Sequence, residues 1–126
     1  MSVYQLSRDE RAAAAVEFAL TAPVFFALLF GMLQVGLVLW TQLGLQHGAE
    51  MAARCASVNS ATCGTVSAIQ NFAAQQALGL NPPATTFAVT TPACGNKVSA
   101  SYNYHFITGY LGTPSLTLRA ESCFPS

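Results

Sequence analysis

Apolar residues form one continuous run near the start of the chain and recur periodically after it. From Phe18 to Trp40 the sequence FALTAPVFFALLFGMLQVGLVLW holds 23 residues without a charged side chain. As a helix this run would be roughly 34 Å long, enough to cross a hydrocarbon core of about 30 Å. Trp40 closes the run, where an interfacial aromatic residue is typical of a membrane span. The pattern predicts a transmembrane helix over residues 13–42.

Two other structures would also produce an apolar run near the N-terminus. A secretory signal peptide has an apolar region of about 7 to 15 residues followed by small residues at its cleavage site. This run is longer and ends in Leu39, Trp40 and Thr41. A buried core helix needs a large domain around it, and only 84 residues follow Gln42. Both alternatives are therefore less favoured than a membrane span.

The chain becomes more polar after Trp40, but it has no clear helix stop there. The segment TQLGLQHGAEMAARCASV contains no proline, so we expect the helix to continue to about Ser57, as a helical extension over residues 43–58. Small residues recur at every fourth position of this extension and would let another backbone approach closely. The chain's own C-terminal part is the favoured partner, and a neighbouring subunit is the alternative. The small residues are Gly44, Gly48, Ala52 and Ala56.

A second, shorter helix is predicted after the break at residues 59–64. Its start resembles a capping box formed by Ser67 and Gln70, and its stop is marked by Gly79 and the pair Pro82-Pro83. Apolar residues recur at helical spacings of three and four, which indicates one buried face. These residues are Val66, Ile69, Phe72, Ala73, Ala77 and Leu80.

After Pro83 the apolar period becomes two, which predicts strands with one buried face. The strands are expected around Phe87–Thr91, Val98–Phe106 and Leu116–Ala120. The simplest connection is a three-stranded antiparallel meander. The predicted fold class is therefore α+β and pilin-like in outline: a long N-terminal transmembrane helix continues into an exported domain, residues 59–126, with a second short helix and a small sheet. Its turns are marked by Pro92, Gly95-Asn96, Gly109, Gly112 and Pro114.

Four cysteines follow the apolar run, and the strand order predicts how they pair. A third strand antiparallel to the second ends beside the second strand's beginning, which brings Cys123 close to Cys94. By elimination Cys55 pairs with Cys63. Each disulfide in so small a domain would contribute about 2 to 4 kcal/mol. Neither the Cys-x2-4-Cys spacing of zinc sites nor the Cys-x-x-Cys of redox sites is present.

Charge is scarce, and its distribution indicates an orientation. Only 8% of the residues are charged and the net charge is zero, which argues against a nucleic-acid partner. Arg8 and Arg11 precede the apolar run, whereas only Arg54 lies within about 15 residues after it. We therefore expect a cytoplasmic N-terminus. The cysteines agree, because disulfides persist in an exported domain.

No catalytic residue is predicted. After the apolar run the carboxylates are Glu50 and Glu121 alone, and there is no G-x-S-x-G elbow and no phosphate-binding loop. The chain is therefore not expected to be an enzyme, and no cofactor is expected.

The histidines and tyrosines after the apolar run are not expected to bind a ligand. His47 and His105 are interpreted as solvated side chains, so no metal site is assigned. Tyr102, Tyr104 and Tyr110 could form an aromatic binding surface. The first two share the parity of the apolar strand face, however, which favours core packing.

Glu17 lies at the edge of the apolar run and needs an explanation. A carboxylate near the centre of a bilayer costs several kcal/mol, and less near an interface. Glu17 either extends to the headgroups or is kept to meet a specific cation when helices assemble.

The segment RDERAAAAVEFALTAPVFFALLFG resembles the start of the TadE-like family, minor pilins or pseudopilins of the tight-adherence (Tad, type IVc) pilus. The resemblance rests on the charged leader Arg8–Arg11, the alanine-rich segment, Val16-Glu17-Phe18, Pro23 and Gly31. It continues through WTQLGLQHGAEMAARCA, and the ending LTLRAESCFP is similar to the family's strand-rich tail.

The resemblance implies a cytoplasmic leader, residues 1–12, which a prepilin peptidase removes between Ala12 and Ala13. Ala12 occupies a position where the family generally has Gly. The new ammonium group on Ala13 would then pair with Glu17, which together with Phe18 would set the register of assembling helices.

The resemblance also implies partners and a location. The partners are the prepilin peptidase, other pilin or pseudopilin subunits, the inner-membrane assembly platform and membrane lipid. The chain would be a single-pass inner-membrane protein with a periplasmic C-terminal domain, and it would be extracellular once in the pilus. The alternative is a constitutively membrane-anchored binding module or adhesin that keeps residues 1–12.

Overall fold

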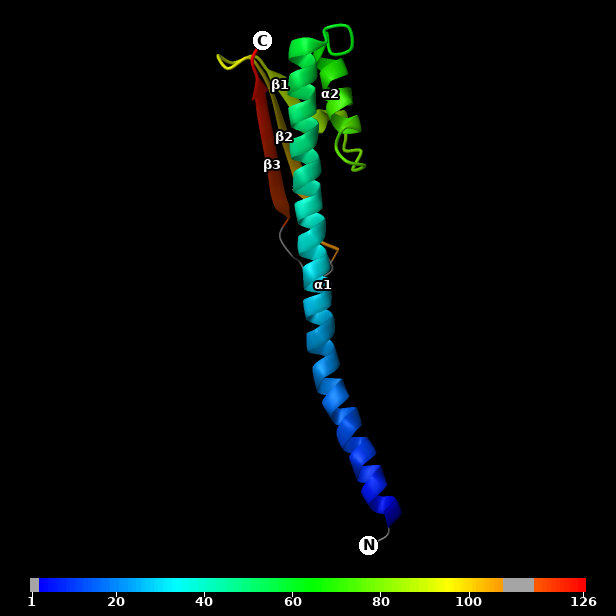
Figure 1. Cartoon of the computed structure of the whole chain (residues 1–126). Helices are drawn as coiled ribbons and strands as arrows, with labels where there is room; N and C mark the ends of the chain where they lie inside the picture. Colours follow the sequence, from blue (N-terminus) through cyan, green and yellow to red (C-terminus); the bar gives the residue numbers. More distant parts are fainter. Residues whose placement is uncertain (1–2, 108–114) are drawn as a thin grey trace. The chain divides into compact units, whose positions relative to one another are not determined.

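The computed structural model describes residues 3–107 and 115–126, which form two helices, a short 3-10 helix and three strands (Figure 1). They confirm the predicted α+β class, with a long apolar N-terminal helix, a second short helix and an antiparallel sheet. The chain divides into two compact units, Met1–Gly36 and Leu37–Ser126.

Helix α1 spans Val3–Val58, so it supplies the described part of the first unit and continues into the second. It ends one residue after Ser57, the predicted end. Pro23 lies inside the helix, where its ring leaves the carbonyl of Ala19 without the usual amide donor.

Helix α2, Val66–Gln75, starts and ends at other residues than the sequence predicts. Thr65 caps its start, because the Thr65 hydroxyl accepts a hydrogen bond from the Ala68 amide at 3.2 Å. The predicted cap, Ser67, is wrong: Ser67 lies inside the first turn. Thr65 is extended, as a capping residue must be, and its oxygen reaches an amide that the helix leaves free.

The end of α2 comes before Gly79. Gln76 is the C-cap, and its amide donates to the carbonyl of Phe72 at 3.0 Å. The next turns contain Leu78 and Gly79 with positive φ angles of 51° and 80°, which a continuing helix excludes. Ala77 therefore lies beyond the helix, although it is fully buried.

Three strands form one antiparallel sheet in the order β1-β2-β3, which confirms the predicted meander. The 3-10 helix η1, Ala84–Thr86, leads into β1, Phe87–Thr90. β2 is Asn96–Tyr104 and β3 is Leu116–Phe124. Gly95 has a φ of 117° in the turn before β2. A Cβ there would also meet the carbonyl oxygen of Phe124, so this position requires glycine. The other predicted turn residues, Gly109, Gly112 and Pro114, lie outside the described residues.

The core lies in the second unit, where the C-terminal part of α1 packs against α2 and one face of the sheet. Phe87, Leu45 and Val98 are its largest fully buried side chains. Small residues fill much of the rest, so backbones lie close together. The buried small residues are Ala49, Ala52, Ala53, Ala73, Ala77, Ala100 and Ala120.

Candidate functional site

Helix α1 presents a long series of exposed apolar side chains in the first unit. The helix is apolar and long enough to cross a membrane, with a mean hydropathy of 2.2 over a stretch of which nothing is buried. Rings in this stretch contact one another: Phe26 lies 5.6 Å from Phe25 and 6.4 Å from Phe30, between ring centroids. A continuous exposed apolar surface of this kind indicates a membrane or a protein neighbour. The long apolar helix suggests a membrane anchor.

Glu17 and Phe18 are both exposed on α1. No ion pair to Glu17 is formed among the side chains that the structure describes. The Thr21 hydroxyl lies 3.0 Å from the carbonyl oxygen of Glu17 and 3.3 Å from that of Phe18, and it can donate to either one. Thr21 thus satisfies its polar group within the helix, while the Glu17 carboxylate is free to meet a partner from outside.

Ala12 and Ala13 lie in the same helix with exposed side chains. Ala13 and Glu17 are four residues apart, which places them one above the other on one face of a helix. The structure therefore puts the two residues of the expected pair on one side of α1.

Two glycines of the small-residue stripe contact the chain's own C-terminal part. A Cβ on Gly44 would come within 2.9 Å of the Ala77 carbonyl oxygen. A Cβ on Gly48 would lie 2.6 Å from the Ala73 carbonyl oxygen and 3.2 Å from the ring of Phe87. The two distances to carbonyl oxygens are shorter than real Cβ contacts, so the close approach of these backbones depends on glycine.

The other two residues of the stripe face the same core. Ala52 is fully buried, and Ala56 is half-buried and packs against the buried cluster. The stripe thus packs against the chain's own C-terminal part, within the second unit, which is the partner that the sequence favoured.

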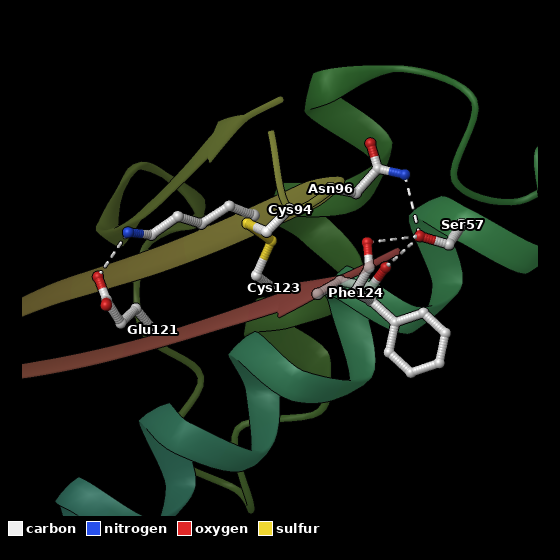
Figure 2. The surroundings of a disulfide bond; sticks show 8 residues. Ser57, Cys94, Asn96, Glu121, Cys123 and Phe124 are labelled. Carbon is white, nitrogen blue, oxygen red and sulfur yellow. Dashed lines mark hydrogen bonds and ion pairs between the residues drawn. A yellow bond between two sulfur atoms is a disulfide. The ribbon is translucent and has the colours of Figure 1, made fainter. Parts of the chain in front are cut away.

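The four cysteines form two disulfides in the pairs that the strand order predicts. Cys55 and Cys63 are buried and bonded, with an S–S distance of 1.99 Å, and they close the loop between α1 and α2. Cys94 and Cys123 are bonded at 1.95 Å and join the turn before β2 to the end of β3 (Figure 2).

Helix α1 also holds the edge strand β3 by hydrogen bonds that the sequence pattern did not predict. The Gln42 side-chain amide donates to the carbonyl of Arg119 at 2.7 Å. One turn later the Gln46 amide donates to the carbonyl of Glu121 at 3.3 Å. The spacing of the two glutamines indicates a shared helix face, but nothing in it identifies β3 as the acceptor.

Ser57, next to the C-terminal end of α1, contacts two strands. The Asn96 side-chain amide donates to the Ser57 hydroxyl at 3.0 Å (Figure 2). The hydroxyl lies 3.3 Å from the carbonyl oxygens of Phe124 and Ala53, and its single hydrogen serves one of them at a time. The start of β2 and the end of β3 thus meet the end of α1 at one serine.

His47 differs from its sequence interpretation, and the prediction of a solvated side chain there is wrong. His47 is half-buried, and its Nδ1 lies 2.8 Å from the carbonyl oxygen of Gln76, so that nitrogen carries a proton. His47 thereby satisfies a carbonyl at the end of α2. His105 is exposed.

Tyr102 and Tyr104 are half-buried and pack against the core, in agreement with the favoured interpretation. Tyr110 lies outside the described residues. Within residues 3–107 and 115–126, no group of three or more His, Cys, Asp or Glu side chains could hold a metal ion. Glu50 accepts a hydrogen bond from Gln46 at 2.9 Å, and Glu121 forms an ion pair with Lys97 at 2.8 Å.

Comparison with known proteins gives one family match. Residues 12–54 match the family model described as TadE-like protein, which confirms the resemblance found in the sequence. The matched residues cover about a third of the chain and include the whole apolar run. Searches of the curated proteins and of the solved structures gave no match.

Proposed function

We propose that this chain is a membrane-anchored minor pilin or pseudopilin of a Tad pilus, which takes part in pilus assembly, initiation or tip formation for surface adherence. The TadE-like match over residues 12–54 carries the proposal. It begins at the residue before the proposed cut, includes Glu17 and the whole apolar run, and ends in the helical extension.

In this proposal the chain has four functional parts. Residues 1–12 are a cytoplasmic leader, residues 13–42 span the inner membrane, residues 43–58 extend the helix, and residues 59–126 form the exported domain. The two disulfides support a periplasmic location for the last part, because disulfides persist in the periplasm. The same part is extracellular once the subunit has entered a pilus.

Processing and assembly are linked through one charge pair. Cutting between Ala12 and Ala13 creates an ammonium group one helical turn from the Glu17 carboxylate, or within reach of the Glu17 of a neighbouring subunit. Pairing offsets part of the cost of placing a carboxylate in an apolar surrounding, and leaving the carboxylate without a partner there costs more. Parallel helices can make this pair between subunits at one axial stagger, so the pair sets their register. Phe18 packs beside it in the apolar contact.

Helix α1 serves twice, first as a membrane anchor and then as a packing stalk among other pilin or pseudopilin subunits. Pro23 supports this double use, because the helix lacks one backbone hydrogen bond there and can loosen locally when it leaves the bilayer. The further partners are the prepilin peptidase, which recognises the leader, and the inner-membrane assembly platform.

The N-terminal peptide mass of protein extracted from membranes tests this function. Cells that carry the protein's own prepilin peptidase should give a chain that starts at Ala13, and cells without the peptidase should give the uncut chain. Ala12→Gly restores the residue that the family generally has before the cut and should keep processing. Ala12→Phe, which places a large ring beside the scissile bond, should stop it.

The two other possible N-termini would each indicate a different function. A chain that starts at Met1 or Ser2 in peptidase-containing cells would favour the alternative, a permanent membrane anchor for an exported binding module or adhesin. A chain that starts after Trp40 would identify a cleaved signal peptide and contradict the pilin assignment.

A further inference from the structure

One end of the sheet carries four apolar or aromatic side chains, of which Ile107 and Leu116 are exposed and Tyr104 and Phe106 are half-buried. At this end Tyr104 of β2 pairs with Leu116 of β3, and Phe106 and Ile107 follow β2. Ile107 is 75% exposed and Leu116 is 41% exposed, while the Tyr104 and Phe106 rings meet edge to face at 5.4 Å. These four residues form the apolar sheet end.

The apolar sheet end belongs to a long stretch without charge. Between Lys97 and Arg119 the sequence has no Asp, Glu, Lys or Arg. The opposite end of the sheet is different, because Lys97 and Glu121 form an ion pair there and Asn96 bonds to Ser57. The ion pair thus lies toward the end of the sheet that also carries Phe124, which is 38% exposed, whereas the apolar sheet end has no Asp, Glu, Lys or Arg.

The hydrogen bonds between α1 and β3 show at which level of the helix the apolar sheet end lies. Gln42 bonds to Arg119 and Gln46 to Glu121, so four residues of helix correspond to two residues of strand. At about 1.5 Å per helical residue and about 3.3 Å per strand residue, both steps are about 6 Å. Strand β3 thus runs alongside α1 in the same direction (Figure 1).

The same rises place Leu116 relative to the end of the apolar run. Leu116 precedes Arg119 by three strand residues, about 10 Å. Leu37 precedes Gln42 by five helical residues, about 7.5 Å. The apolar sheet end therefore reaches at least the level of Leu37, past Trp40, which is the last residue of the apolar run.

We propose that the apolar sheet end inserts into the headgroup region of the same bilayer that α1 spans, as a second membrane contact of the domain. The proposal rests on the membrane anchor of the proposed function. It follows from the shared level, because whatever membrane surface lies at Trp40 also lies at Leu116 and Tyr104. Ile107 and Leu116 suit this depth, since both are aliphatic and exposed.

A bilayer explains the apolar sheet end better than a neighbouring subunit does. Ile107, the most exposed of the large apolar side chains described in the second unit, lies with Leu116 at one level, and a membrane surface is a boundary at one level. With two contacts, helix and sheet end, the domain would stand in a fixed orientation on the membrane before assembly.

Tryptophan fluorescence in lipid vesicles tests the proposal, because Trp40 is the only tryptophan. The full chain is reconstituted into phosphatidylethanolamine and phosphatidylglycerol vesicles, with or without acyl chains brominated close to the headgroup. In one variant Trp40→Phe is combined with Ile107→Trp. The matched control combines Trp40→Phe with Val58→Trp, because Val58 is likewise aliphatic and 69% exposed but ends α1 at the opposite end of the sheet.

The expected result is a loss of most emission from the Ile107→Trp variant in brominated vesicles, similar to the loss for Trp40 in the unchanged chain. The Val58→Trp control should lose almost none. Quenching of Trp40 without quenching of the Ile107→Trp variant would overturn the second contact and leave the anchor intact. A blue-shifted but unquenched Ile107→Trp emission would show a protein contact and also overturn it.

Two further outcomes concern the anchor and the orientation. If Trp40 itself is unquenched, the membrane anchor fails and the second contact fails with it. If the Val58→Trp control is quenched as strongly as the Ile107→Trp variant, the domain lies flat on the membrane, which contradicts a contact at the sheet end alone.

Discussion

Gly48 leaves no room for a side chain between α1 and the rest of its domain. We expect Gly48→Ala to lower the free energy of unfolding by about 1 to 3 kcal/mol, the usual cost of overpacking a core. The methyl group would meet the backbone carbonyl oxygen of Ala73 at 2.6 Å, and a backbone cannot move aside as a flexible side chain can. Chemical unfolding of the detergent-solubilised chain, followed by near-ultraviolet circular dichroism, measures the effect.

Gly36 provides the matched control on the same helix. A Cβ on Gly36 would meet nothing within 4 Å, so Gly36→Ala should leave the unfolding of the second unit unchanged. The substitution would favour the helix itself by about 1 kcal/mol. If Gly48→Ala unfolds like the unchanged chain, the close approach of α1 and α2 is contradicted.

Single residues are predictable from the sequence where a local rule singles them out. Glu17 was recognised because it is the last charge before the apolar run, and Gly44 and Gly48 because of their spacing. His47 and Ser57 were missed as contacts because their partners, the carbonyls of Gln76 and Phe124, are distant in the chain. A local sequence pattern does not predict which distant backbone carbonyl will lie next to these side chains.

At the scale of elements, the antiparallel order of the strands makes a prediction about stability. Cys94→Ser, Cys123→Ser and the double variant should each lower the free energy of unfolding by the same amount, about 3 to 4 kcal/mol. The two sulfur atoms form one bond across 29 residues, and either substitution removes all of it. Denaturant unfolding of the three variants provides the comparison, with the one free thiol of each single variant alkylated and the double variant left unmodified, because it has no free thiol.

The Cys55–Cys63 disulfide serves as an internal control, because peptide mapping should find it intact in all three variants. Losses that add up in the double variant would show that Cys94 and Cys123 act independently, because removing both ends of one bond costs no more than removing one.

The elements with a strong period were predictable, and their ends were less so. Alternation gave the three strands, and the lack of a stop signal gave the long α1. The end of α2 was placed too late because Ala77 and Leu80 keep a helical spacing while lying in the turns after Gln76. Both residues still pack against the core, so their apolar character has a tertiary cause and does not indicate that the helix continues.

At the scale of the whole molecule, the two units differ in whether their large apolar side chains are buried within the protein. The second unit has its own core, whereas the large apolar side chains of residues 16–36 are exposed along the helix. Composition made this difference predictable, because a run without charge that long matches a bilayer better than a small domain. The sequence alone did not reveal that the sheet reaches the level at which the apolar run ends, because that depends on how β3 bonds to α1.

In the proposed function α1 lies first in the bilayer and then in the filament, and Glu17 is present in both. Glu17→Gln tests whether its charge matters for membrane insertion or for assembly. The substitution removes the charge and keeps the shape, so we expect normal membrane insertion but reduced pilus assembly. Insertion is measured by resistance of the protein to alkaline extraction from membranes, and assembly by its amount in sheared pili. An uncharged amide inserts more easily than a carboxylate but cannot neutralise the ammonium group on Ala13.

Glu10→Gln is the matched control, because Glu10 is also exposed on α1 but lies in the leader that processing removes. It should leave both insertion and assembly unchanged. Normal incorporation of the Glu17→Gln subunit into pili would remove the charge pair as the source of register, and the stagger of the helices would then have to come from apolar packing around Phe18. Equal losses in both variants would point instead to recognition of the leader, because Glu10 is absent from the assembled subunit.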